Sequence, residues 1–246
     1  MHVYEKRGER YGICEYFSAY GDKIPAYQSA DRGSSSENFR LHDRGRIFPP
    51  DNLLALLRFS GRHTRISLDK PVYKEKLRLR VYGTPTDSSP VFLEIKKKYD
   101  GVVYKRRVST DFAQAMRFLT EGIPPESGDY VARQVTAEMT HMIRRDGLIP
   151  RAAVFYDRRA FHGADDPELR LTLDGNIRYR LGDLDLRNGT DGDTIPGQPF
   201  RIMEIKSASS IPLWLAGTLS ELGIHPGSFS KYGSVYKQRF QDLCTT

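Results

Sequence analysis

The chain has 246 residues, a formal net charge of +7, 39% hydrophobic residues and 11% aromatic residues. This length allows one large domain or two small ones, and the charge favours anionic partners such as nucleic acid, phosphate esters or acidic lipid. No apolar run approaches the ~18–20 residues of a membrane span, and the N-terminus lacks a signal-peptide core. The two cysteines, Cys14 and Cys244, lack metal-ligand or redox spacing, so we expect a reduced, cytoplasmic protein.

Residues 1–63 differ in character from the rest of the chain. They show no sustained period of two or 3.6, and their only apolar patch is Leu-Leu-Ala-Leu-Leu at 53–57. Without a periodic apolar face a segment has little to bury against a core. We therefore expect a poorly ordered leader.

Three alternating runs between residues 73 and 107 carry the strongest pattern. Side chains at a period of two point to opposite faces of a strand, and in the first two runs leucine, isoleucine or valine side chains share the face opposite the charges. The charged positions are Lys74, Lys76, Arg78 and Arg80 in the first run, Glu94, Lys96 and Lys98 in the second, and Lys105 and Arg107 in the third. Turn-forming residues 83–90 and the pair Asp100-Gly101 separate the runs.

The charged face of these runs is almost purely cationic, whereas an ordinary exposed strand mixes both signs with Ser, Thr and Gln. Like charges repel one another unless a polyanion lies between them. The pattern therefore predicts an anion-binding surface or, if the sheet curls on itself, a tunnel lined with Lys and Arg. A solvated basic face is the alternative.

The remaining segments alternate between helical and strand patterns. Asp111 is a suitable N-cap for a helix over 112–122, and residues 129–146 repeat apolar side chains at intervals of three and four. Strands are predicted at 151–161, 168–174 and 200–207, and a short helix at 212–222. The acidic loop 183–199 lacks the Glu that an EF-hand calcium site requires. Together these segments predict an α+β fold, an antiparallel barrel with a polar interior and flanking helices.

Seven short motifs occur in an order that resembles a known family. They are K-E-K-L-R-L-R-x-Y-G, V-F-L-E-I-K-K-K, G-V-V-x-K-R-R, F-Y-x-R-x-A-F, L-R-x-T-x-D, M-E-I-K and S-F-S-K-Y. In this order they resemble the VTC domain, the polyphosphate polymerase branch of the triphosphate tunnel metalloenzyme (CYTH-like) superfamily. The resemblance spans about residues 67–236. We therefore assign 64–240 to a VTC-like domain and 1–63 to a non-matching segment.

This resemblance implies an enzyme that passes the γ-phosphate of ATP to a growing polyphosphate chain inside a basic tunnel, with Mn²⁺ or Mg²⁺ as the cofactor. The catalytic phosphate ligands that it implies are Arg78, Arg80, Arg158, Arg170 and Lys231. The further substrate-binding residues are Lys76, Lys96, Lys98, Lys105, Arg107, Tyr156, Lys206 and Ser230. Glu204 matches the metal-binding glutamate, and Ser230 and Lys231 match the last strand of the tunnel. The expected partners are ATP, polyphosphate and a membrane protein, with no specific nucleic acid.

Residues 1–63 depart from the family, which opens with a strand bearing E-x-K-Y and later a strand resembling I-x-x-x-Y-Y-D-T-P-D. A one-nucleotide shift of the reading frame over residues 20–26 allows M-E-I-K-Y-R, and the same shift over 51–62 allows T-I-C-S-L-Y-Y-D-F-P-D. We infer a reading-frame error, which the nucleotide sequence of the gene tests. Such an error predicts a sheet that is incomplete at its N-terminus, with exposed edges, and a product that folds poorly or is inactive.

Two other functions stay open at this point. A tunnel-fold triphosphatase or nucleotide cyclase would need several lining acids for two metals, and Glu94, Glu204 and Asp174 are the clearest candidates in the sequence. A non-catalytic polyphosphate- or RNA-binding protein would interleave aromatic side chains with its cations, and only Tyr82 and Tyr104 lie near the strand ends.

Overall fold

The computed structural model describes residues 72–100, 102–163, 166–195, 201–208, 210–227 and 229–235 with their side chains, and the backbone of 14–20, 41–43, 48–58 and 200. Its helices are α3 (Phe112–Glu121), α4 (Tyr130–Asp146) and α5 (Leu213–Glu221), with the 3-10 turn η2 (Leu186–Asn188). Its strands are β1 (Cys14–Tyr20), β2 (Leu41–Asp43), β3 (Phe48–Arg58), β4 (Tyr73–Tyr82), β5 (Pro90–Tyr99), β6 (Val102–Asp111), β7 (Leu148–Gly163), β8 (Arg170–Arg180), β9 (Asp193–Thr194), β10 (Phe200–Lys206) and β11 (Pro226–Gly227).

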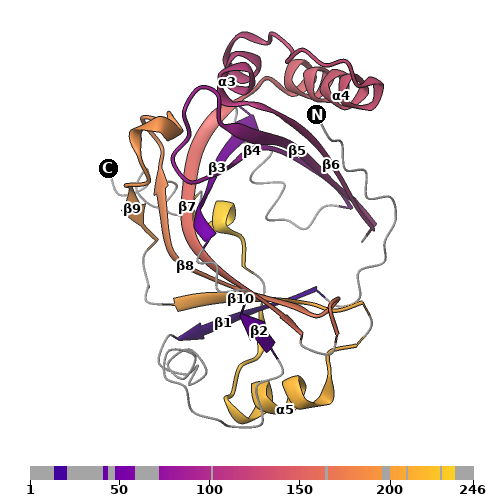
Figure 1. Ribbon diagram of the computed structural model, residues 1–246, viewed down its shortest axis with the longest axis vertical. Coiled ribbons are helices and arrows are strands. Elements are labelled where there is room, and N and C mark those ends of the chain that lie inside the picture. Colours follow the sequence, from indigo (N-terminus) through magenta and orange to yellow (C-terminus); the bar gives the residue numbers. More distant parts are fainter. Residues whose placement is uncertain are drawn as a thin grey trace.

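These strands form one curved antiparallel sheet (Figure 1). The strand order is β11-β1-β10-β8-β7-β3-β4-β5-β6, with β2 and β9 paired to the sides of β7 and β8. The predicted α+β class is confirmed, but the predicted closed barrel is not formed by the strands that the structure describes. Strand β6 has its ladder partner β5 on one side and runs directly into α3, so it ends the sheet instead of closing it.

Three strands come from residues 1–63, where the sequence predicted an irregular leader. Strand β3 lies between β4 and β7, with Leu54 opposite both Leu79 and Ala153. Strand β1 pairs with β10 along its whole length, from Cys14 opposite Lys206 to Tyr20 opposite Phe200. The reading-frame inference predicted a sheet that is incomplete at its N-terminus, but at the level of the backbone β1 and β3 are both part of the sheet. Parts of 20–26 and 51–62 lie outside the described residues, so the inferred reading-frame error stays a prediction.

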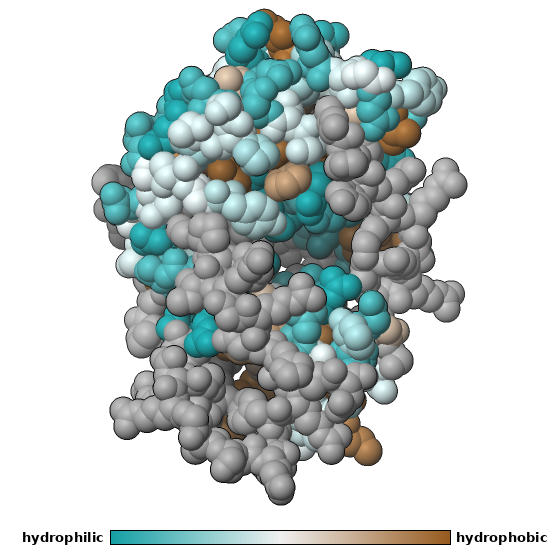
Figure 2. Space-filling model, viewed as in Figure 1, coloured by the Kyte–Doolittle hydropathy of each residue, from teal (hydrophilic) through white to brown (hydrophobic). Residues whose placement is uncertain are grey.

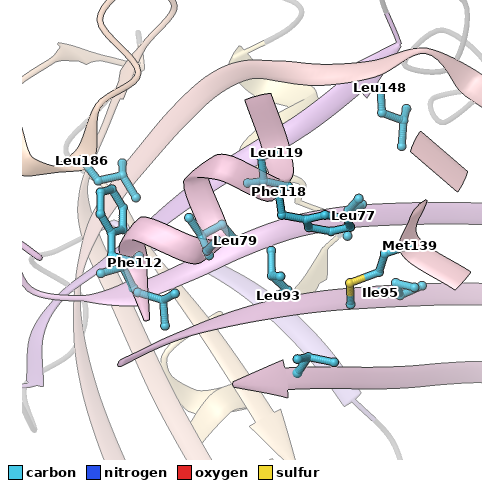
Figure 3. Close-up of a cluster of buried hydrophobic side chains, with 14 of the residues drawn as sticks. Leu77, Leu79, Leu93, Ile95, Phe112, Phe118, Leu119, Met139, Leu148 and Leu186 are labelled. Atoms are coloured by element: carbon cyan, nitrogen blue, oxygen red, sulfur yellow. The ribbon is translucent and has the colours of Figure 1, made fainter. Parts of the chain in front are cut away.

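Helices α3 and α4 cover one face of β4–β6 and bury the larger core. The Asp111 side chain caps α3 by accepting from the backbone N–H of Gln114 at 2.7 Å, and the left-handed Gly122 ends that helix. Figure 3 shows the strand side chains of this core packed against residues of both helices. Members of this core include Leu77, Leu79, Leu93, Ile95, Phe112, Phe118, Leu119, Met139, Leu148 and Leu186.

Two smaller apolar clusters complete the fold. One packs α5 against β8 and β10 through Leu171, Met203 and Leu215, at the end of the sheet that Figure 1 shows opposite α3 and α4. The other lies on the reverse face of the sheet, where β7, β8 and β10 meet the C-terminal residues through Tyr156 and Val235. The three helices therefore share one face of the sheet, and the opposite face is left for other side chains.

Replacement of Leu79 by alanine tests the assignment of the larger core. Leu79 is 0% exposed, so Leu79→Ala is expected to lower the free energy of unfolding by about 2–5 kcal/mol because a cavity remains. Leu213 is 91% exposed, and Leu213→Ala is expected to change it by less than about 0.5 kcal/mol. Urea denaturation measures both values, and equal losses from the two variants would contradict the assignment.

Candidate functional site

The face of the sheet turned away from α3, α4 and α5, here called the inner face, collects the cations predicted from the sequence. Leu77 and Leu79 of β4 point into the helix-covered core, so Lys76, Arg78 and Arg80 of the same strand point the other way. The antiparallel register places Arg78 opposite Glu94, and Glu94 opposite Arg107. One row across β4, β5 and β6 therefore reads Arg-Glu-Arg.

The first group on this face, called the Glu94 cluster, consists of Glu94, Arg78, Arg80, Lys105 and Arg107. Arg78 donates through Nε to Glu94 Oε2 at 2.7 Å, and Arg80 Nε lies 3.9 Å from the same oxygen. Lys105 Nζ and Arg107 Nη2 each lie 3.2 Å from Oε1, as ion pairs without hydrogen-bond alignment. A single carboxylate, 1% exposed, therefore faces four cations.

The pKa values in this region follow from burial and charge. Burial alone would raise the pKa of Glu94, but Arg78, Arg80, Lys105 and Arg107 outweigh it and lower the pKa to about 2. Burial lowers the pKa of Lys105 to about 8 despite the attraction of Glu94. Burial, together with Lys74, Lys96 and Arg78, lowers the pKa of Lys76 to about 8. Burial, with a smaller contribution from neighbouring cations, therefore disfavours the charged form of these two lysines.

The second group, called the Asp174 cluster, consists of Asp174, Arg158, Lys231 and Tyr156. Arg158 donates to Asp174 through Nε at 2.6 Å and Nη2 at 2.7 Å, a two-pronged contact, and Lys231 Nζ donates to Oδ2 at 2.6 Å. Both cations also stand over the Tyr156 ring, Lys231 at 4.2 Å and Arg158 at 5.2 Å from its centroid. Burial would raise the pKa of Asp174, but Arg158 and Lys231 hold it below its ordinary value.

Glu204 and Lys206 stand beside this cluster on β10. Their charged groups lie 2.9 Å apart, and Glu204 is opposite Thr172 in the ladder with β8. Leu171 and Leu173 point to α5, so Thr172 shares the inner face with Arg170 and Asp174. Burial lowers the pKa of Lys231, and the negative charge of Glu204 partly opposes this shift.

A helical turn over residues 231–235 connects the two clusters, where the sequence motif S-F-S-K-Y predicted a strand. The backbone N–H of Ser234 donates to the carbonyl oxygen of Ser230 at 2.9 Å, an i to i+4 bond that a strand cannot make. This turn carries Lys231 to Asp174 and places Tyr232 in the apolar cluster of the inner face, within reach of the charge of Arg78. In Figure 1 it is the short yellow helix beside β7.

Tyr232 is a residue that the sequence argument did not single out. Its hydroxyl is buried without a hydrogen-bond partner, and burial raises its pKa above the ordinary value of tyrosine. The motif that contains Tyr232 alternates small and large residues, a pattern that favours a strand. Only the contact between its ring and the side chains of β7 and β8 reveals its position.

Most of the predicted site residues fall in these groups. Lys76, Arg78, Arg80, Lys96, Lys105 and Arg107 lie on the inner face of β4–β6, and Tyr156, Arg158, Glu204, Lys206 and Lys231 lie in or beside the Asp174 cluster. Three others have peripheral contacts. Lys98 is exposed near the end of β5, Arg170 lies 3.6 Å from Glu168 at the start of β8, and Ser230 accepts from the N–H of Gly233 as a cap.

The opposite, helix-covered face carries charges of both signs. Lys97 lies 3.2 Å from Glu75 and 2.5 Å from Glu138 of α4. Arg106 pairs with Glu138, and Arg145 pairs with Glu75 and Asp146. Three carboxylates therefore balance three cations. Neighbouring residues of one strand, Lys96 and Lys97 or Arg106 and Arg107, thus belong to faces with different charge balance.

Metal binding on the inner face would depend on isolated acids. Among the residues that the structure describes, no three His, Cys, Asp or Glu side chains group as a ready metal site. Glu204 is the acid that the sequence assigned to a metal, and its side chain is 14% exposed beside Lys206. One carboxylate fits a Mg²⁺ or Mn²⁺ ion that takes its other ligands from water and phosphate oxygens.

The arrangement is suited to holding an extended anion. Figure 2 shows hydrophilic residues above and below the centre of the view. Arginine presents fork-like donors to phosphate or carboxylate oxygens, and clustered cations gain most from a partner with several negative charges. The side chains within the clusters that could act as a nucleophile are held in ion pairs or buried, so the groups favour binding and charge neutralisation over covalent chemistry.

The chain was compared with domain profiles, curated protein sequences and solved structures. The profile of the VTC domain matches residues 64–240, and no curated protein sequence matches the chain. A Bacillus halodurans protein named as a candidate adenylate cyclase has a similar structure, with a TM-score of 0.53 and 11% identity, over 89% of this chain and 94% of that one. A Pyrococcus horikoshii protein covers 92% of this chain and 99% of its own, with a TM-score of 0.44 and 12% identity.

The likeness to the Bacillus halodurans protein concerns the fold alone, because only 11% of the residues are identical. In the part of the chain that the structure describes, no helix has the length and apolar character needed to cross a membrane. The match to the domain profile extends over more than half of the chain and includes both clusters of the inner face. The chain therefore belongs to the VTC domain family.

Proposed function

We propose that this protein is a polyphosphate polymerase that transfers the γ-phosphate of ATP to the end of a polyphosphate chain held along the inner face. The observation that carries the proposal is the Glu94 cluster, in which Arg78, Arg80, Lys105 and Arg107 share one buried carboxylate. Lys76 and Lys96 extend the same face on β4 and β5. Such an excess of fixed positive charge is unfavourable without a polyanion.

The chemistry of phosphoryl transfer suits a site of this kind. The protein must mainly align the transferred group with its acceptor and neutralise the charge on its oxygens, so cations suffice without a protein nucleophile. We assign Arg78, Arg80, Arg158, Arg170 and Lys231 to phosphate oxygens, with Lys76, Lys96, Lys98, Lys105, Arg107, Tyr156, Lys206 and Ser230 lining the path. In this proposal the polyphosphate chain lies along the inner face of the curved sheet.

A divalent metal is the expected cofactor, and Glu204 is the residue that would hold it. Bound there, Mn²⁺ or Mg²⁺ would withdraw charge from phosphate oxygens during transfer. The chain's own residues would orient the phosphates. Asp174 already holds the Arg158 guanidinium through two hydrogen bonds, and Lys231 contacts both Asp174 and the Tyr156 ring. ATP and polyphosphate are then the partners of the site.

The reaction products separate this proposal from its competitors. Incubation with ATP and Mn²⁺ is expected to yield long polyphosphate and ADP. Orthophosphate alone would indicate a triphosphatase, and cyclic AMP with pyrophosphate would indicate a cyclase. Binding of polyphosphate without turnover would indicate a non-catalytic binder, and equal competition by RNA at matched salt would remove the preference for polyphosphate.

A pair of neighbouring arginines tests which face is functional. Arg107 faces the Glu94 cluster, whereas Arg106 faces Glu138 of α4. Arg107→Gln is expected to lower the rate of polyphosphate synthesis by about ten- to a hundred-fold, since a charged hydrogen bond to phosphate is lost. Arg106→Gln is expected to change it by less than about two-fold, because exposed ion pairs contribute little.

Synthesis from ATP is measured as polyphosphate formed per unit time, and circular dichroism checks that both variants fold. Equal losses in the two variants, or a loss confined to Arg106→Gln, would place the substrate away from the inner face.

The binding of long polyphosphate is expected to weaken as the pH rises past 8. Lys76 and Lys105 have pKa values of about 8, below the ordinary 10.5. Both lysines are charged below pH 8 and become neutral above it. The affinity for polyphosphate is therefore expected to fall by about ten-fold between pH 7 and pH 9.5. Fluorescence anisotropy of labelled polyphosphate at constant ionic strength measures this change.

The double variant Lys76→Arg/Lys105→Arg keeps both charges in this range and should bind almost independently of pH. Lys97→Arg is the control, because Lys97 faces the helices, where burial would lower its pKa but Glu138 and Glu75 outweigh burial and raise it. If the double variant shows the same loss of affinity as the wild type, the two lysines do not carry the effect.

A further inference from the structure

The balance of charge differs sharply between the two faces of β4–β6. On the helix-covered face, Glu75, Glu138 and Asp146 contact Lys97, Arg106 and Arg145. On the inner face the four cations of the Glu94 cluster meet one carboxylate. A purely structural ion network on the inner face would be stabilised by further acids, as the network on the helix-covered face is. The presence of a single acid, Glu94, among the four cations of the inner face therefore needs an explanation.

Glu94 occupies the centre of its cluster, but it engages only part of what surrounds it. Arg78 gives it one aligned hydrogen bond through Nε. Lys105 and Arg107 approach Oε1 at 3.2 Å without hydrogen-bond alignment, and Arg80 lies 3.9 Å from Oε2. Arginine has five N–H donors and lysine has three. The four cations thus have more N–H donors than the two oxygens of Glu94 engage, and they surround a position where a negative oxygen is already favoured.

We propose that the Glu94 carboxylate is an internal counter-ion that competes with substrate phosphate oxygens for Arg78, Arg80, Lys105 and Arg107, and so keeps the binding of the polyanion reversible. This inference rests on the proposed function for the identity of the anion. Glu94 is in this view a positioning residue, which acts on the substrate through the cations it holds.

The inference has a physical reason in the reaction itself. A chain that grows by one phosphate at a time must shift along its binding site after each transfer. Binding that is equally strong in the ground state and in the transition state lowers KM without raising kcat, and slow release of a tightly held product lowers kcat. An enclosed carboxylate offsets part of the attraction, while its partners stay ordered.

Glu94→Gln removes this competition and is expected to tighten the binding of inorganic triphosphate in the absence of metal by about ten-fold. The same variant is expected to lower both KM and kcat for polyphosphate synthesis. Glu138→Gln is the matched control, because it removes an acid from the balanced network on the helix-covered face. It should leave triphosphate affinity within about two-fold of the wild type.

The variant leaves four cations without their carboxylate, so its folding needs a separate measurement. Its Tm should be lower than that of the wild type without triphosphate, and triphosphate should raise it by more than in the wild type. The double variant Glu94→Gln/Arg107→Gln restores the charge balance of the cluster. It is expected to recover stability and to bind triphosphate more weakly than Glu94→Gln alone.

The outcomes separate this inference from the proposed function. If folded Glu94→Gln binds triphosphate no more tightly than the wild type, the counter-ion role is wrong. If the variant loses only metal-dependent binding, Glu94 is a metal ligand and the inference is again overturned. If the wild type makes no polyphosphate while Glu94→Gln still tightens triphosphate binding, the proposed function fails and the counter-ion role stands.

Discussion

The repulsion among cations on one face of a curved sheet is the constraint on which this structure depends. Strand alternation sends Leu77, Leu79, Leu93 and Ile95 of β4 and β5 to the helices, and the cations of the Glu94 cluster to the other side. Two buried carboxylates, Glu94 and Asp174, partly offset the resulting charge. Because neither balances its neighbours fully, the face retains an attraction for anions that the fold itself does not satisfy.

The two clusters differ in how much of this attraction remains. Asp174 holds Arg158 in a two-pronged contact and Lys231 through a short hydrogen bond, so two cations share one carboxylate and both are oriented by it. Glu94 is shared by four cations at longer distances. An extended anion would thus be attracted mainly by β4–β6 and aligned mainly by β7, β8 and the helical turn that carries Lys231. Glu204 stands at this second end, where the proposed transfer would need a metal.

Local pattern was sufficient to predict the parts of the site that depend on a single strand. The period of two assigned Lys76, Arg78, Arg80, Lys105 and Arg107 to one face, and Asp111 and Gly122 marked the limits of α3. Contacts between distant segments could not be predicted in this way. Lys231 meets Asp174 across 57 positions of sequence, and the helical turn that brings it there was expected as a strand. The position of β6 at the edge of the described strands likewise depends on which strands pair, which no local period encodes.

The adjacent arginines of β6 show why charge count alone says little about function. Arg106 and Arg107 are identical in chemistry and one position apart, yet one pairs with an acid of α4 and the other adds to an unbalanced cluster. The net charge of +7 averages over both kinds of site. What distinguishes them is the ratio of cations to acids on each face, and that ratio is set by strand alternation together with the helices that cover one side. A basic protein attracts a polyanion most strongly where its fold places several cations on one surface without an equal number of acids.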